Sequence, residues 1–218
     1  MKARRRGDAG FTLIEVLVAI ALFSFLSTAL MSVLISTSKA VTAGKQVSTI
    51  NEEARLALER ITREIRQAKQ VVAVRLPTLT DPTTSMTLWV DFNGNNLQDD
   101  TAADPEIVTY AYDPIAHRLT LTANDQYGTA VTRPILAENV SAFTLGFHSS
   151  LYAYDKNLDG ITDWTELDAT PGVGNQNGIL DGPELALIDT VTINLSVLQG
   201  TRQQTYQTQT NLRNLNQS

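Results

Sequence analysis

Oxygen-bearing side chains recur at alternate positions in a 12-residue stretch, residues 155–166. Gly160 stands at the sixth position, where the chain must turn sharply, and Glu166 closes the stretch at the twelfth. A hard cation with about six to eight oxygen ligands requires this spacing, with a backbone carbonyl at the seventh position and a bidentate glutamate at the end. The stretch therefore predicts a calcium loop. Its expected ligands are Asp155, Asn157, Asp159, Ile161, Asp163 and Glu166.

The charge balance of the same segment also favours a cation. Residues 155–189 contain eight carboxylates, and Lys156 is the one basic side chain among them. Without a bound cation these carboxylates would repel one another, although a solvated acidic turn is the alternative interpretation. The flanking sequence does not predict two long helices. We expect a calcium loop inserted in a sheet domain, with one helical turn at residues 164–167.

Two further stretches fit the calcium pattern in part. Residues 173–184 begin with Val173, whose side chain cannot ligate, so they predict a partial site or ligands that complete the first one. Residues 91–102 have Asn96 at the turn position and Ala102 at the closing position, so a hairpin turn is the favoured interpretation. The weaker candidate ligands are Asn175, Asn177, Asp181, Glu184, Asp91, Asn93, Asn95 and Asp99.

The composition excludes several kinds of chemistry. The 218 residues include no Cys, which excludes disulfides, thiolate metal sites and Cys nucleophiles. His117 and His148 belong to no metal-binding or triad signature, and no phosphate-binding glycine loop is present. We therefore expect no enzymatic activity. With 17 basic and 23 acidic residues and a formal charge of −6, the chain is not expected to bind nucleic acid directly.

A single carboxylate interrupts a long apolar run near the amino terminus. The run, residues 11–35, contains Glu15 as its one charged residue and follows a basic segment with Lys2 and residues 4–6. It is too long for the apolar core of a secretory signal peptide and matches the roughly 20 residues that span a bilayer. A plain single-pass anchor would explain the run but not Glu15, because a carboxylate in hydrocarbon is unfavourable unless it is paired.

The string GFTLIEVLVAI at residues 10–20 resembles the class III signal of type IV prepilins and type II secretion pseudopilins. The resemblance implies that prepilin peptidase cuts after Gly10, on the cytoplasmic side of the membrane, and that the new terminus, Phe11, is N-methylated. It also implies that the apolar helix stays in the cytoplasmic membrane, with the following domain outside the cytoplasm. The basic segment before the run agrees with that orientation.

Glu15 acquires a role in this scheme. The amine created at Phe11 stays cationic after methylation, and a neighbouring subunit shifted along the axis would offer its own amine to Glu15. Such pairing would satisfy both charges and fix the axial register, and its repetition gives a filament. The expected partners are other pilin or pseudopilin subunits, the prepilin peptidase and methyltransferase, the inner-membrane assembly platform, membrane lipid and calcium.

The remaining sequence predicts an α+β fold. Apolar residues recur every three or four positions over residues 50–72, so we expect one long helix over about residues 11–72, with a soft spot at 36–44 and its second half packed on the domain. After Pro77 the apolar period becomes two, which predicts an antiparallel sheet. This is also the pilin fold that the resemblance implies. The predicted strands are residues 86–91, 107–112, 118–122, 131–137, 142–148, 190–197 and 203–212.

The sequence thus predicts four successive parts. They are a cleaved leader at 1–10, a transmembrane or filament-core half of the helix at 11–35, an amphipathic half at 36–76, and a sheet domain at 77–218 with an insertion at about 152–188. The length and the inserted loops are most similar to the larger W-type minor pilins and J-type pseudopilins. We expect a structural subunit that joins or primes a type IV pilus or a type II secretion pseudopilus. The alternative is a calcium-binding adhesin or binding module, anchored in the membrane or carried by a filament.

Overall fold

The computed structural model describes residues 12–98, 106–125, 127–136, 138–199 and 202–212. The chain divides into two compact units, Met1–Ser48 and Thr49–Ser218. The elements in chain order are α1 (Leu13–Gln67), β1 (Ala68–Arg75), β2 (Thr84–Val90), β3 (Ile107–Asp113), β4 (Arg118–Asn124), β5 (Ala130–Leu136), β6 (Val140–Ser149), η1 (Tyr152–Tyr154), β7 (Thr162–Asp163), α2 (Trp164–Asp168), α3 (Gly182–Leu185), β8 (Thr190–Gln199) and β9 (Arg202–Asn211).

The first unit contains the apolar part of α1. Every residue from Leu13 to Thr49 is exposed, including the large apolar side chains of the predicted span. Hydroxyl groups within this part bond back to the helix, as Ser24 Oγ does to Ile20 O at 2.8 Å and Thr28 Oγ1 to Ser24 O at 2.8 Å. Such internal bonds satisfy hydroxyls in hydrocarbon. The predicted soft spot is helical throughout residues 36–44.

In the second unit, the last part of α1 packs an apolar stripe onto the domain. The stripe follows the predicted helical spacing, and its buried apolar members on α1 are Ala54, Ala57, Leu58, Ile61 and Ile65. The prediction that the helix continues to Val72 is wrong, because α1 ends at Gln67 and β1 follows directly. Val71, Val72 and Val74 are β-branched and favour a strand once β2 offers an antiparallel partner, which the helical spacing alone does not reveal.

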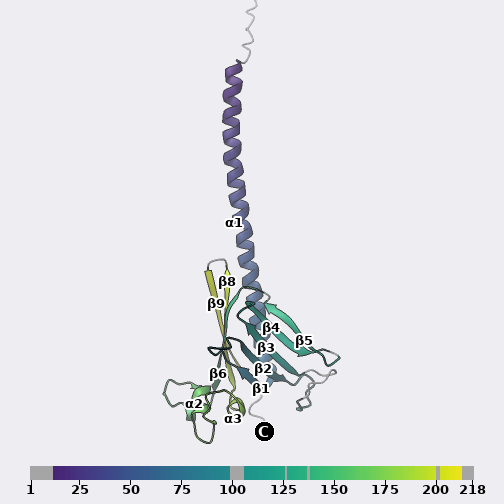
Figure 1. Ribbon diagram of the computed structural model, residues 1–218, viewed down its shortest axis with the longest axis vertical. Helices are drawn as coiled ribbons and strands as arrows, with labels where there is room; N and C mark the ends of the chain where they lie inside the picture. Colours follow the sequence, from purple (N-terminus) through teal and green to yellow (C-terminus); the bar gives the residue numbers. More distant parts are fainter. Residues whose placement is uncertain (1–11, 99–105, 126, 137, 200–201, 213–218) are drawn as a thin grey trace, which may run out of the picture. The chain divides into compact units, whose positions relative to one another are not determined.

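The described strands form two antiparallel sheets instead of the single sheet that the sequence predicted. One has the order β1-β2-β3-β4-β5 and the other β7-β6-β8-β9. In β2 the buried residues alternate with half-buried ones, so Met86, Leu88 and Val90 face the core together. That core also takes in Tyr110 from β3 and Phe143 from β6, and therefore joins both sheets to the end of α1. The predicted α+β class, a long amino-terminal helix on antiparallel sheets, is confirmed (Figure 1).

The inserted segment lies between β6 and β8. It contains η1, the short strand β7, and the helices α2 and α3, and α2 coincides with the predicted helical turn. Strand β7 pairs with the end of β6, which anchors the start of the segment to the second sheet. The two short helices lie near each other at one end of that sheet (Figure 1).

Candidate functional site

The first predicted calcium loop is wrapped around its own side chains. Asp155 accepts hydrogen bonds from two backbone amides, Leu158 N at 2.7 Å and Gly160 N at 2.9 Å. The same arrangement continues at alternate positions, since Asn157 Oδ1 accepts from Asp159 N and Asp159 Oδ1 from Ile161 N, each at 2.8 Å. The oxygen-bearing side chains at positions 1, 3 and 5 are thus held on one side of the loop.

The closing glutamate of this loop turns back toward its beginning. Glu166 is 8% exposed, and its Oε1 accepts from Lys156 N at 2.9 Å and Asn157 N at 3.0 Å. Asp163 caps α2, and Glu166 Oε2 accepts from Asp163 N at 3.2 Å, so the two acids form a capping box. The cap fixes the start of α2 and with it the position of the closing carboxylate against the loop.

All three candidate loops have left-handed backbone angles at the same two positions. Positions 4 and 6 have left-handed φ in each loop: 61° and 84° at Leu158 and Gly160, 60° and 74° at Gln176 and Gly178, and 76° and 59° at Gly94 and Asn96. The sequence pattern predicted a turn only at position 6. A leucine rarely adopts positive φ, so Leu158 marks local strain of the kind that accumulates at functional loops.

The carboxylates of the inserted segment have no basic partner among the described residues. The salt bridges Arg60–Glu64, Lys69–Asp91, Arg75–Asp81 and Arg118–Asp113 all lie outside this segment. Lys156 donates instead to the carbonyl of Ala169, at 2.7 Å, behind the carboxyl end of α2. The residues described contain no ready cluster of three or more acidic or histidine side chains that could hold a metal ion. Any cation would therefore draw on amide and backbone oxygens as well.

The second loop uses a residue that the sequence pattern missed. Asp168, at the end of α2, accepts from Asn177 N at 3.1 Å and Gly178 N at 2.9 Å, although it precedes the predicted stretch. Both carboxylate oxygens of Asp181 accept from side-chain amides, of Asn175 at 2.7 Å and Asn177 at 3.0 Å. No local spacing could have identified Asp168, because the fold brings it to the loop.

The third loop has a built-in cation. Asp91 accepts from Gly94 N at 2.6 Å and Asn96 N at 3.2 Å, as Asp155 does in the first loop. Here, however, Lys69 Nζ lies 3.6 Å from Asp91 Oδ2 and donates to Asn96 Oδ1 at 2.7 Å. The ammonium group of Lys69 therefore offsets the charge of the first candidate ligand of this loop. Asp99 lies outside the described residues.

At the amino terminus the structure adds a partner for Glu15. Glu15 Oε2 accepts from Thr12 N at 2.9 Å and from Thr12 Oγ1 at 3.0 Å, and Glu15 N donates to Thr12 Oγ1 at 3.3 Å. This is a capping box at the start of α1, and the Thr-x-x-Glu spacing would have revealed it. Gly10 and Phe11 lie outside the described residues. Among the residues described, α1 is the helix long and apolar enough to cross a membrane.

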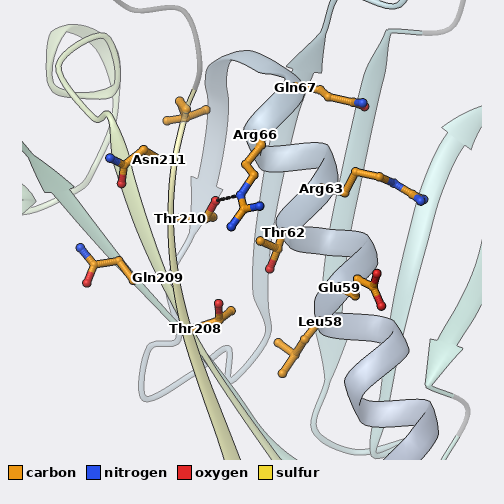
Figure 2. Close-up of a pocket in the computed structure, with 11 residues that line it drawn as sticks. Leu58, Glu59, Thr62, Arg63, Arg66, Gln67, Thr208, Gln209, Thr210 and Asn211 are labelled. Carbon is orange, nitrogen blue, oxygen red and sulfur yellow. Dashed lines mark hydrogen bonds between the residues drawn. The ribbon is translucent and has the colours of Figure 1, made fainter.

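A groove of about 1040 Å³ lies between the last part of α1 and the edge strand β9 (Figure 2). Arg63 and Arg66 border it from the helix, and Arg66 Nε donates to Thr210 Oγ1 at 3.3 Å across it. The residues that line the groove include no His, Cys or Ser and a single carboxylate, Glu59. The charged side chains of its lining are thus one carboxylate and two guanidinium groups.

Comparison with known proteins identifies one segment. Residues 5–31 match the family described as the prokaryotic N-terminal methylation motif. The matched residues contain Glu15 and most of the apolar run, up to residue 31. No curated protein and no solved structure matches the chain. The motif supports a precursor of the type IV pilin kind, processed at its amino terminus and held in a membrane by the helix that follows.

Proposed function

From the N-terminal methylation motif at residues 5–31, we propose that the chain is a minor pilin or pseudopilin. It is made as a precursor, cut after Gly10 by prepilin peptidase, methylated on Phe11, and assembled into a type IV pilus or a type II secretion pseudopilus, or used to prime one. The inserted acidic segment favours a W-type minor pilin or a J-type pseudopilin. The motif is the observation that carries this proposal.

The exposed apolar surface of α1 supports membrane insertion followed by assembly. From Leu13 to Ile35 the helix presents large apolar side chains without any cover, a surface far too long to remain in water. A bilayer covers it in the precursor, with the basic leader on the cytoplasmic side and the domain outside. Neighbouring copies of the same helical surface cover it in a filament. The same segment of α1 is therefore buried both in the membrane-inserted precursor and in the assembled filament.

Glu15 connects processing to assembly. Its carboxylate is held at the first turn of α1 by Thr12, the residue that follows Phe11 in the sequence. The amine of a neighbouring subunit, shifted along the filament axis, then pairs with this carboxylate and sets the register. Before cleavage that amine does not exist, and the basic leader would have to enter hydrocarbon.

The first inserted loop binds calcium in this proposal. It combines the ligand spacing of residues 155–166 with a closing Glu166 that is already turned against the loop. Calcium neutralises carboxylates that have no basic partner in the described residues and fixes the loop at the end of β6, where β7 pairs with it. The chain has no Cys, so the ion takes the stabilising place that a disulfide would otherwise fill.

The decisive experiment is the intact mass of the chain extracted from membranes of cells that contain a prepilin peptidase. The expected mass lacks residues 1–10 and carries one added methyl group. A Gly10→Glu variant places a bulky charge at the cleavage position and should keep its leader, which serves as the control. An unprocessed wild-type terminus would contradict the proposal, whatever the calcium content of the domain.

A further inference from the structure

We propose that the inserted segment holds a second divalent-cation site, in which Asp168 supplies the ligand that Val173 cannot. The site takes a hard cation of the calcium class. It goes beyond the proposed function, because neither processing nor filament assembly enters the argument. Its ligands are Asp168, Asn175, Asn177, the backbone carbonyl of Ile179, Asp181 and Glu184.

A buried carboxylate oxygen without a partner points to the missing ion. Glu184 is 0% exposed, and its Oε2 has no hydrogen-bond partner. Its other oxygen, Oε1, accepts from Asn175 N at 2.8 Å, so the carboxylate lies directly against the loop. A cation held by the loop satisfies Oε2 and offsets its charge.

Asp168 binds the turn of the second loop in the same way that Asp155 binds the turn of the first loop. Each carboxylate accepts a hydrogen bond from the amide of the turn glycine at position 6, from Gly160 to Asp155 and from Gly178 to Asp168, both at 2.9 Å. Glu184 likewise matches Glu166, because each accepts from the amide at position 3 of its loop. The second loop therefore repeats two of the contacts that the first loop makes with its first and last ligands, and the residue in the first role comes from elsewhere in the chain.

A close backbone approach makes this delivery possible. Thr170 O accepts from Val173 N at 3.1 Å and Gly174 N at 3.0 Å, which turns the chain back onto the end of α2. A Cβ atom on residue 174 would lie 2.3 Å from Asp168 Cα and 2.5 Å from its carbonyl oxygen. Only glycine fits there. Gly174 thus brings the second loop to Asp168.

Helix α2 places one ligand in each site. Glu166 and Asp168 are two residues apart, so their side chains leave the helix on different faces, and each accepts from the backbone of a different loop. Binding in one loop therefore fixes the short helix that carries a ligand of the other. We expect positive cooperativity between the sites for this reason.

Six oxygen-bearing groups, three of them carboxylates, suit calcium better than magnesium. A bidentate Glu184 would raise the number of oxygen ligands to about seven, which calcium accepts and the strict octahedral shell of magnesium does not. Neutral amide and carbonyl oxygens make up half of the groups. Calcium tolerates such mixed ligands in a flexible loop, so we name it as the probe.

The test is the number of calcium ions bound per full-length chain, measured by equilibrium dialysis in detergent. The wild-type chain should bind two. Glu184→Gln and Asp168→Asn keep the hydrogen-bond acceptors of these positions and should each bind one, as should Asp159→Asn in the first loop. Glu138→Gln removes an exposed carboxylate outside the segment and should still bind two. Far-ultraviolet circular dichroism establishes that each variant is folded.

The outcomes separate this proposal from the others. Suppose that the wild-type chain binds one ion, and that Asp159→Asn abolishes this binding whereas Glu184→Gln does not. That result would overturn the second site and support the first. Loss of all binding in Glu184→Gln would mean that the second loop merely completes a single site, and would also overturn the proposal. Two ions in the wild type and one in each single-site variant support it, even if the leader is never cleaved.

Discussion

The clearest quantitative prediction concerns a buried phenol that fixes α1 to the sheet. Tyr110 on β3 is 0% exposed, and its hydroxyl donates to Glu64 on the buried stripe of α1. Glu64 is 9% exposed, and its other oxygen lies 3.1 Å from Arg60 Nε. Tyr110→Phe removes the hydroxyl alone. It leaves a buried carboxylate with one of its two partners and should therefore weaken the attachment of the helix.

The size of the loss follows from the kind of hydrogen bond. A buried bond to a charged acceptor contributes about 2 kcal/mol, so Tyr110→Phe should lower the free energy of unfolding by about that amount. For a unit the size of Thr49–Ser218 this corresponds to a melting temperature lower by about 4–8 °C. Tyr112→Phe is the matched control. Its hydroxyl donates to a neutral carbonyl, Val140 O, at 3.3 Å, so a loss of about 1 kcal/mol or less is expected.

The pH dependence gives a second measurement on the same pair. Burial, with a smaller contribution from the charge of Glu64, raises the pKa of Tyr110 well above its usual range. The phenol therefore stays protonated in the folded chain at pH values where the unfolded chain has lost the proton. Its contribution to stability is complete below about pH 10 and declines as the pH rises further. Tyr110→Phe should show a shallower decline than the wild type.

The assay is denaturant unfolding of the full-length chain in detergent, followed by circular dichroism. A double-mutant cycle with Glu64→Gln isolates the pair. The reasoning fails if Tyr110→Phe changes stability by less than about 0.5 kcal/mol, or if its effect is the same in the Glu64→Gln background. In either case the hydroxyl and the carboxylate would not be energetically coupled.

Three further predictions concern the proposed sites. Glu15→Gln keeps an acceptor for the Thr12 cap but loses the charge, so it should be inserted and cleaved yet fail to assemble; normal filaments would restrict Glu15 to capping. Calcium at about a hundred times its dissociation constant should stabilise the chain by about 2.7 kcal/mol per site, measured as a rise in melting temperature over a chelator control. An unchanged melting temperature would count against both loops. Gly174→Ala should lower the stability of the chain and reduce the number of bound calcium ions from two to one, because its Cβ would collide with the backbone of Asp168. Gly44→Ala should change neither quantity, because nothing lies within 4 Å of a Cβ at that position. A Gly174→Ala chain that binds two ions would show that the close approach is not needed.

Local spacing was sufficient for the parts of the chain that are governed by neighbouring residues. The apolar run predicted α1, alternation predicted seven of the strands within a few residues of their bounds, and the ligand spacing predicted the turn at Gly160. These features depend on the helical and extended periods and on the conformational freedom of glycine, all of which are properties of short segments. The capping box of Thr12 and Glu15 belongs with them.

Features that depend on distant partners could be decided only by the folded chain. Helix α1 stops at Gln67 because β2 pairs with the residues that follow it, and the strands belong to two sheets that share one core with the end of that helix. Asp168 reaches the second loop, and Lys69 reaches the third, through contacts across chain reversals. The spacing of residues along the sequence shows which side chains could act as ligands. Tertiary packing decides which of them come into contact, because burial and strand pairing act between segments that are distant in the sequence.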